Sequence, residues 1–260
     1  SAGRDDPELT RLRIVIANVW TPNRQADALL SLVRRHDPDL LLTVETDSWW
    51  ESQLDTLREQ YPYAVKYPLP NTYGMLLYSR YPLVRPEVRF LVEDDVPSID
   101  TEVEIPEGGN VRFIALHPRP PPPSKMQDST NRDAELVIVG QQVAHREGPL
   151  IVAGDLNDVA WSYTTDLFQR LSGLLDPRRG RGMYNSFNAR IPLLRFPLDH
   201  IFHSEHFRLV RLARLPAVGS DHFPLLAELS YQREAIDSHS SPERRHGDRK
   251  LARELRSRAQ

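Results

Sequence analysis

The stretch IVAGDLNDVAWS, residues 151–162, joins an apolar run to an acid, an amide and a second acid. The apolar run predicts a buried strand, and Gly154 at its end lets the backbone approach a ligand closely. Asp155 could accept a proton from an attacking water, and Asn157 could orient that water or a phosphoryl oxygen. An ordinary Asx turn that closes a strand would use the same residue types. The stretch therefore indicates catalysis only if other strands supply partners.

Five further apolar runs carry polar side chains at similar positions. Each run ends in, contains or follows an acid, an amide or a histidine: Asn18 (RIVIAN), Glu45 (DLLLTVE), His117 (VRFIALH), Asp199 (PLDHIF) and the pair Asp221 and His222 (SDHFP). Each residue alone is more often a turn residue than a ligand. Independent turns would not select this set so consistently, so we expect the strand ends to meet at one edge of a sheet.

Asp199 and His222 form the most specific pair in this set. A carboxylate inside an apolar strand needs a partner, and a histidine whose tautomer must be fixed is a natural one. Two alternatives stay open at this point. Asp199 can be a surface acid on an edge strand, and His222 can be a structural histidine beside a turn aspartate.

Brought together at one edge, these residues would supply the groups for one reaction. Carboxylate and amide oxygens form the hard site that Mg²⁺ or Mn²⁺ prefers. Two histidines and a general base would lie beside the ion. This is the equipment for metal-assisted attack of water on phosphorus.

The hydrophobic pattern predicts a mixed α/β domain over residues 12–231. We expect strands at 13–19, 39–44, 64–67, 74–79, 83–92, 101–105, 111–117, 149–154, 198–203, 207–215 and 223–230, and helices at 26–36, 48–60, 131–145 and 164–171. Residues 1–11 are expected to be a flexible segment. Residues 232–260 are polar and highly charged, and we expect a disordered or frayed helical tail.

Composition excludes several classes of site. The 260-residue chain has no cysteine, which rules out disulfides, thiolate metal sites and a cysteine nucleophile. Its net charge of -3 does not favour the broadly basic surface of a general nucleic-acid binder. No apolar run is long enough to span a membrane.

Taken in order, these motifs resemble those of the endonuclease/exonuclease/phosphatase superfamily over residues 12–230. This superfamily includes pancreatic-type deoxyribonuclease, apurinic-site endonucleases, inositol-polyphosphate 5-phosphatases and neutral sphingomyelinases. The matching elements are a strand-end asparagine followed by DLLLTVE, ALH, GDLN, LDHI and SDHFP. The resemblance implies a four-layered α/β sandwich, in which two mixed β-sheets pack face to face between helices.

The resemblance also implies a metal site with Mg²⁺ or Mn²⁺. Glu45 resembles the main metal ligand, with Asn18 and Asp221 nearby. Some apurinic-site enzymes carry a further acid two residues after the strand-end asparagine, where this chain has Trp20. One ion is therefore expected rather than two.

The same resemblance implies the catalytic roles. Asp155 resembles the residue that activates or orients water, and Asn157 the amide that positions water and phosphate. Asp199 would pair with His222, which would stabilise charge on the phosphoryl oxygens. His117 resembles the second histidine of the deoxyribonuclease and sphingomyelinase branches.

From this resemblance we expect a phosphodiesterase that acts on nucleic acid or on a phospholipid head group. A phosphomonoesterase of the same fold and a catalytically silent binding module are the alternatives. Residues 183–202, together with SDHFP, resemble a bacterial subgroup of unassigned substrate whose members often carry preceding membrane segments. We therefore expect a monomeric, extracytoplasmic domain with a membrane tether outside this sequence, and otherwise a cytoplasmic protein.

Overall fold

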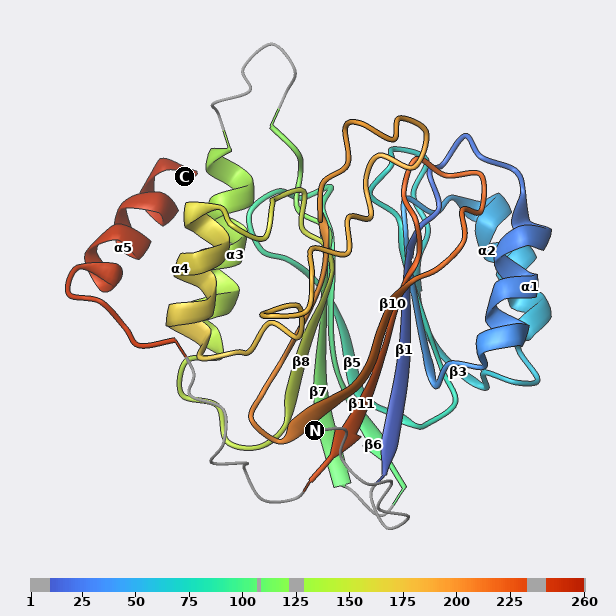
Figure 1. Cartoon of the computed structure of the whole chain (residues 1–260), viewed down its shortest axis with the longest axis horizontal. Coiled ribbons are helices and arrows are strands. Elements are labelled where there is room, and N and C mark those ends of the chain that lie inside the picture. The colour runs from blue at the N-terminus through green and yellow to red at the C-terminus, as the bar shows by residue number, and fades with distance from the viewer. Residues whose placement is uncertain (1–9, 107–108, 122–128, 233–241, 260) are drawn as a thin grey trace.

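Two β-sheets pack face to face in the computed structural model, which describes residues 10–106, 109–121, 129–232 and 242–259 (Figure 1). The six-stranded sheet has the order β10 (Phe207–Arg214), β11 (Leu225–Tyr231), β1 (Arg11–Asn18), β2 (Leu40–Val44), β4 (Met75–Ser79) and β3 (Tyr63–Tyr67). The five-stranded sheet has the order β5 (Leu83–Phe90), β6 (Pro97–Ile105), β7 (Gly109–Leu116), β8 (Leu150–Asp155) and β9 (Asp199–His203). No described helix is long and apolar enough to cross a membrane.

Helices cover the outer faces of both sheets, which gives the expected four-layered sandwich. Helices α1 (Ala26–His36) and α2 (Ser48–Leu54), with a 3₁₀ turn at Asp55–Leu57, cover the six-stranded sheet (Figure 1). Helices α3 (Thr130–Gln142) and α4 (Tyr163–Ser172) cover the other sheet. The expected helix over 48–60 is therefore shorter, because its last part tightens into the 3₁₀ turn.

Strand β1 shows why the apolar runs are continuous. Ile14 and Ile16 pack between the two sheets, whereas Val15 and Ala17 pack under α1 and α2. Successive side chains of a strand point to opposite faces, so a strand buried on both faces needs apolar residues throughout. The uninterrupted runs in the sequence thus encode the inner layers of a sandwich.

Strand register brings the polar strand ends to one edge. β1 and β2 run parallel with Asn18 opposite Val44, the residue before Glu45. β7 and β8 also run parallel, and β9 runs antiparallel to β8 with Asp199 opposite Asp155. The ends of β1, β2, β7 and β8 therefore meet the start of β9 at the same edge.

The backbone of the neighbouring strand explains why position 154 is a glycine. Its φ is +146°, and a Cβ at this position would lie 1.9 Å from the backbone oxygen of Leu116 on β7. The close approach of the neighbouring strand is thus sufficient to require a glycine here. It lets β8 and β7 end side by side, which places Asp155 next to His117.

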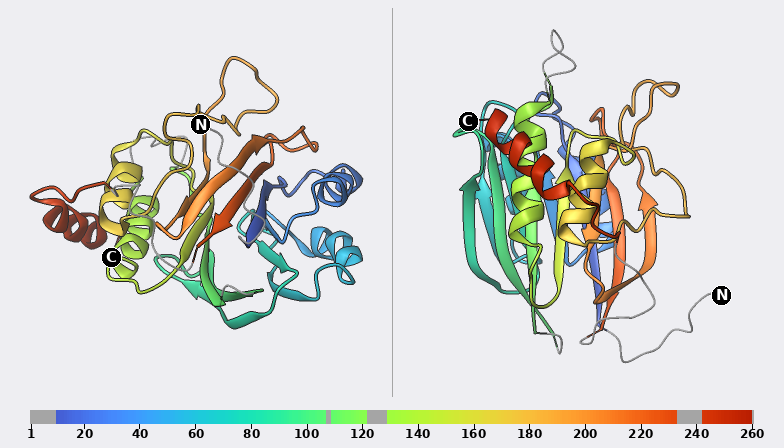
Figure 2. Two further views of the ribbon diagram at one scale, coloured as in Figure 1. Left: turned by 60° about the horizontal axis from the view of Figure 1, so that its bottom comes forward. Right: turned by 90° about the vertical axis from the view of Figure 1, so that its left-hand side faces the viewer.

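Part of the polar tail, for which we expected either disorder or a frayed helix, is a helix packed on the domain. Asp248–Arg258 forms helix α5, which packs on α3 and α4 (Figure 2). Ala252 is fully buried in this contact, and the Arg170 guanidinium of α4 holds the Asp248 carboxylate at 2.9 Å. A narrow apolar stripe with one buried ion pair fixes a helix that polar composition alone would leave free. Residues 1–9 of the expected N-terminal segment, and 233–241 and 260 of the tail, lie outside the described residues.

Candidate active site

Asp155 is the centre of the polar cluster at the sheet edge. Its Oδ2 accepts a hydrogen bond of 3.0 Å from the Asn18 amide, and its Oδ1 accepts one of 3.0 Å from the Asn157 backbone N–H. The same Oδ2 lies 3.5 Å from Nε2 of His222 and 3.9 Å from Nε2 of His117. Burial raises the pKa of Asp155, while His222 acts in the opposite direction.

Asn18 brings a second carboxylate to the cluster. Its amide nitrogen donates to Glu45 Oε1 at 2.8 Å as well as to Asp155, and its oxygen accepts from the Trp20 N–H. The backbone donor fixes the orientation of the amide. Burial, assisted by the negative charge of Asp155, raises the pKa of Glu45 to about 7 against the opposing Asn18 hydrogen bond.

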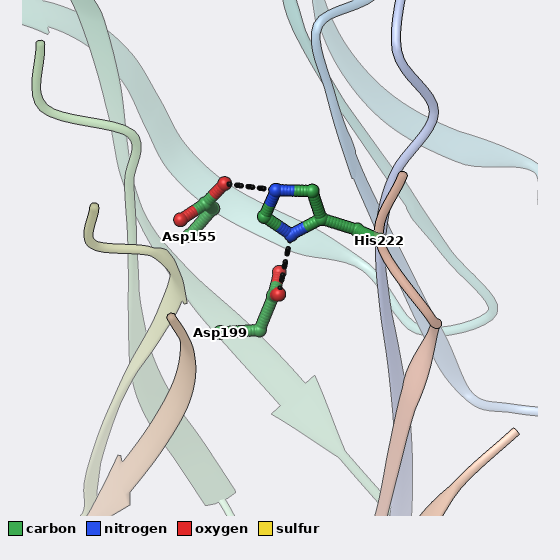
Figure 3. Close-up of side chains that lie close together, drawn as sticks. All are labelled: Asp155, Asp199 and His222. Atoms are coloured by element: carbon green, nitrogen blue, oxygen red, sulfur yellow. Dashed lines mark hydrogen bonds and ion pairs between the residues drawn. The ribbon is translucent and has the colours of Figure 1, made fainter. Parts of the chain in front are cut away.

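His222 and Asp199 form the expected hydrogen-bonded pair (Figure 3). Nδ1 of His222 lies 2.8 Å from Asp199 Oδ2, and both side chains are buried. Burial alone would lower the pKa of His222, but Asp155 and Asp199 together outweigh it and raise that pKa to about 10. The two carboxylates therefore favour the protonated imidazole, whose Nε2 faces Asp155 Oδ2 at 3.5 Å.

The remaining expected residues surround this centre. His117 is buried beside Asp155, and burial lowers its pKa. Asn157 donates its amide to the Pro118 carbonyl at 3.0 Å, which holds it at the mouth of β8. Asp221 is half-buried, and its negative charge raises the pKa of Glu45 and of His222. The structure thus brings all eight predicted residues to one edge.

The backbone at this edge is held in an uncommon conformation. Glu45, Asn157 and Trp20 have φ of +59°, +50° and +57°. Positive φ is unfavourable for residues with a Cβ, and it persists where the surrounding structure holds it, often at active sites. Here the conformation turns two predicted site residues inward as their strands end.

Two contacts of the site had no signal in the sequence. The ring of Phe187 lies 5.0 Å from the ring of His222, and Tyr73 lies 5.7 Å from His117, both as centroid distances. Phe187 also forms an isolated β-bridge with His222. Phe187 lies in the stretch 183–202 that resembles the bacterial subgroup, but only the folded chain shows that it packs on His222 and that Tyr73 packs on His117.

The donor set fits a divalent cation. Glu45 and Asp155 approach each other across one neutral amide, and their mutual repulsion would be relieved by a positive ion. Asp155, Asp199 and His222 also lie close enough to share an ion, with candidate ligand atoms within 4.8 Å of one another. A protonated His222 has no free lone pair, so that trio is a weaker ligand set than the two carboxylates.

Comparisons with known proteins agree with this geometry. The model of the Endonuclease/Exonuclease/phosphatase family matches residues 15–222. No curated protein sequence matches the chain.

Solved structures with this fold include D. rerio TDP2 in complex with a single-strand DNA product. Its TM-score is 0.71 at 16% identity, over 85% of this chain and 99% of that chain. A family protein from Bacteroides thetaiotaomicron has a TM-score of 0.68 at 19% identity, over 89% of this chain and 99% of that one. The human Nocturnin catalytic domain with bound sulfate has a TM-score of 0.68 at 18% identity, over 85% of this chain and 95% of that chain. At these identities the likeness concerns the fold.

Proposed function

The chain belongs to the endonuclease/exonuclease/phosphatase family, and on that premise we propose that it hydrolyses phosphodiester bonds with the help of Mg²⁺ or Mn²⁺. One observation carries the proposal. The Asp155 carboxylate forms with Glu45 a pair that suits a cation, and the same carboxylate lies 3.5 Å from His222, a histidine that suits a phosphoryl oxygen. Nucleophile activation and charge stabilisation are therefore available within one hydrogen-bonded cluster.

Asp155 is the residue placed to act on water. Its two oxygens are held by Asn18 and by the Asn157 backbone, so the carboxylate cannot turn away. In this role Asp155 orients a water for in-line attack and accepts its proton. Asn157 anchors that geometry in two ways. Its backbone N–H donates to Asp155, and its side-chain amide donates a hydrogen bond to the Pro118 carbonyl.

His222 is the residue placed to act on phosphate. Asp199 fixes its ring through Nδ1, which leaves Nε2–H as a donor. A donor that carries a positive charge stabilises the negative charge that grows on the phosphoryl oxygens in the transition state. His117 can supply a second contact, since its Nε2 lies 3.9 Å from the same oxygen of Asp155.

Glu45 and Asp155 would hold the divalent cation, with Asn18 keeping them together. Asp221 adds negative charge on the same side. An ion held by these residues would supply Lewis-acid polarisation of the phosphoryl group. Asn18 presents its amide nitrogen to both carboxylates, so in this arrangement it positions the two ligands and does not bind the ion through its oxygen.

The charge of the site favours a diester over a monoester. In the described ranges, no arginine or lysine side chain donates to the carboxylates of Glu45, Asp155 or Asp199. His222 is then the main fixed cation of the cluster. A diester carries one negative charge, whereas a monoester carries up to two and calls for more positive groups.

A substrate screen tests the proposal. The protein is first freed of metal with a chelator. It is then mixed with Mg²⁺ or Mn²⁺ and one of four substrates: bis(p-nitrophenyl) phosphate, p-nitrophenyl phosphate, single-strand DNA or phospholipid. We expect metal-dependent hydrolysis of the diester, loss of that activity in His222→Asn, and normal activity in the matched control His145→Asn, which changes an exposed histidine. Faster cleavage of the monoester would indicate the phosphatase alternative, and no hydrolysis with any substrate would indicate a binding module.

A further inference from the structure

A loop beside the site presents apolar side chains to water. Leu193 is 95% exposed, Leu194 54% and Ile191 46%. With Pro192 they form the sequence IPLL, here called the IPLL turn, residues 191–194. Large exposed apolar groups that lie together usually mark a contact with a partner or a membrane.

The exposure of the IPLL turn is built into the fold. Leu194 N–H donates to the Ile191 carbonyl at 3.1 Å, and Pro192 holds the second position of the turn. Asn188 closes the base, since its Oδ1 accepts from the N–H groups of Arg190 and Ile191. These hydrogen bonds hold the turn in one conformation, and in that conformation the two leucines are exposed.

Arginines flank the IPLL turn without acidic neighbours. Residues 179–197 contain four arginines and no aspartate or glutamate, in a chain of net charge -3. Arg178, just before them, is buried in an ion pair with Asp176. Arg190 lies over the Trp20 ring at 3.9 Å and donates to the Gly219 carbonyl. Arg195 lies over the Phe223 ring at 5.1 Å and donates to the Asn188 carbonyl. Among the described residues no carboxylate pairs with either guanidinium, so both can attract a phosphate.

The base of this loop is joined to the catalytic histidine. Phe187 pairs with His222 through the β-bridge, and the Ala189 N–H donates to the Asp221 carbonyl at 2.7 Å. The segment between α4 and β9 projects from the edge of the sandwich in both views of Figure 2. A surface that engages the IPLL turn would therefore face the predicted active site.

We propose that the IPLL turn and its flanking arginines bind the surface of an anionic phospholipid bilayer. The apolar side chains enter the boundary between head groups and acyl chains, where leaving water stabilises them. Arg190 and Arg195 stay at the level of the head-group phosphates. Nucleic acid would satisfy the arginines but offers no apolar medium for Leu193. The combination of apolar tip and unpaired arginines favours the bilayer.

Cosedimentation with lipid vesicles tests the proposal without any turnover, so its result is independent of the proposed activity. The full chain is mixed with vesicles of phosphatidylcholine and phosphatidylglycerol, and in parallel with pure phosphatidylcholine. We expect binding to the anionic vesicles and about a tenfold weaker partition for Leu193→Ser, the loss expected for one leucine. Arg190→Gln should weaken binding to the anionic vesicles more than to the neutral ones.

Val210→Ser is the matched control, because Val210 is 45% exposed on β10, outside the loop. It should bind vesicles as the wild type does. A wild-type chain that stays in solution with anionic vesicles overturns the proposal, as does an equal loss in Leu193→Ser and Val210→Ser. If Leu193→Ser kept vesicle binding but abolished binding of single-strand DNA or self-association in sedimentation, the loop would serve that partner and the bilayer proposal would be wrong.

Discussion

His222 and His200 are both buried histidines next to Asp199, yet they differ in charge. His222 contacts the Asp199 carboxylate, and the pKa of its imidazole is raised to about 10. His200 follows Asp199 in the chain, so its side chain lies on the opposite face of β9. There, burial and then the Arg178 guanidinium lower the pKa of His200 to about 3.

The hydrogen bonds of His200 explain this neutral state. Its Nε2 donates to the Asp158 carbonyl at 2.8 Å, so that nitrogen carries the proton. Its Nδ1 lies 2.6 Å from Nη2 of Arg178, a group that can only donate. A second proton on His200 would meet the guanidinium. Burial disfavours charge in both histidines, and the sign of the neighbouring charge decides which one becomes a cation.

The side of β9 that carries Asp199 toward His222 is here called the catalytic face, after the role proposed for that pair, and the side that carries His200 toward Arg178 is called the structural face. On the structural face, Arg178 forms a buried ion pair of 2.8 Å with Asp176 and also contacts the Asp199 carbonyl at 3.5 Å. That face therefore supports the strand from which Asp199 reaches His222. Substitutions on the two faces should separate activity from stability.

The largest expected effect is on the catalytic face. His222→Ala and Asp199→Ala should each lower phosphodiester hydrolysis by about 10²–10⁴-fold, because each leaves its partner misaligned or unpaired. The double variant should lie within about tenfold of the single ones, since the two residues act as a unit. Initial rates with Mn²⁺ measure this. Losses that multiply in the double variant would show that the residues act independently.

The next effect is on the structural face. Arg178→Met should lower the free energy of unfolding by about 3–5 kcal/mol, because it leaves the Asp176 carboxylate buried without its partner. Urea unfolding measures this, and the folded protein should keep far more activity than His222→Ala. The control is Arg179→Met, which changes the exposed neighbouring arginine. Equal unfolding free energies for the two variants would contradict a structural role for Arg178.

The smallest expected effect is the response of His200 to pH. In the folded chain the pKa of His200 is about 3, below the usual value of 6.5. Between these two pH values His200 is protonated in the unfolded chain and neutral in the folded chain. The stability from this residue is present above pH 6.5 and is lost as the pH falls toward 3. Between pH 7 and pH 5 it should decrease by about 2 kcal/mol. In urea unfolding, the free energy of unfolding of His200→Gln should fall by about 2 kcal/mol less than that of the wild type between pH 7 and pH 5. An unchanged pH dependence would show that another group takes up the proton.

Strand periodicity predicted a mixed α/β domain whose polar strand ends meet at one edge, and the resemblance to the family implied the four-layered sandwich and the roles of the site residues. Continuous apolar runs mark strands buried on two faces, and a polar residue at the end of such a run must lie at the sheet edge. The contact between Asp199 and His222 could be expected because a buried carboxylate needs a partner. The contact between His200 and Arg178 is not predictable from sequence, because nothing in the pattern indicates that an arginine in the loop before β9 enters the core.

Helix α5 shows where sequence reasoning stops. Leu251, Ala252 and Leu255 make a stripe too narrow to predict a stable helix alone. The helix is held by the surface of α3 and α4 and by the Arg170–Asp248 pair, which bring together residues far apart in the chain. Such docking depends on the shape of the partner surface, which periodicity does not contain.

We propose that Glu45 and Asp155 form a cation site and that hydrolysis of phosphodiesters by this chain requires it. Calorimetric titration of Mn²⁺ into the wild type, Glu45→Gln and Glu135→Gln tests it most directly. Glu135 is the matched control, since burial raises its pKa to about 8 but it lies on helix α3 outside the site. We predict that Glu45→Gln weakens Mn²⁺ binding at least about tenfold while Glu135→Gln binds as the wild type does. Equal Mn²⁺ affinity in all three proteins would contradict the claim, as would full hydrolysis after exhaustive chelation.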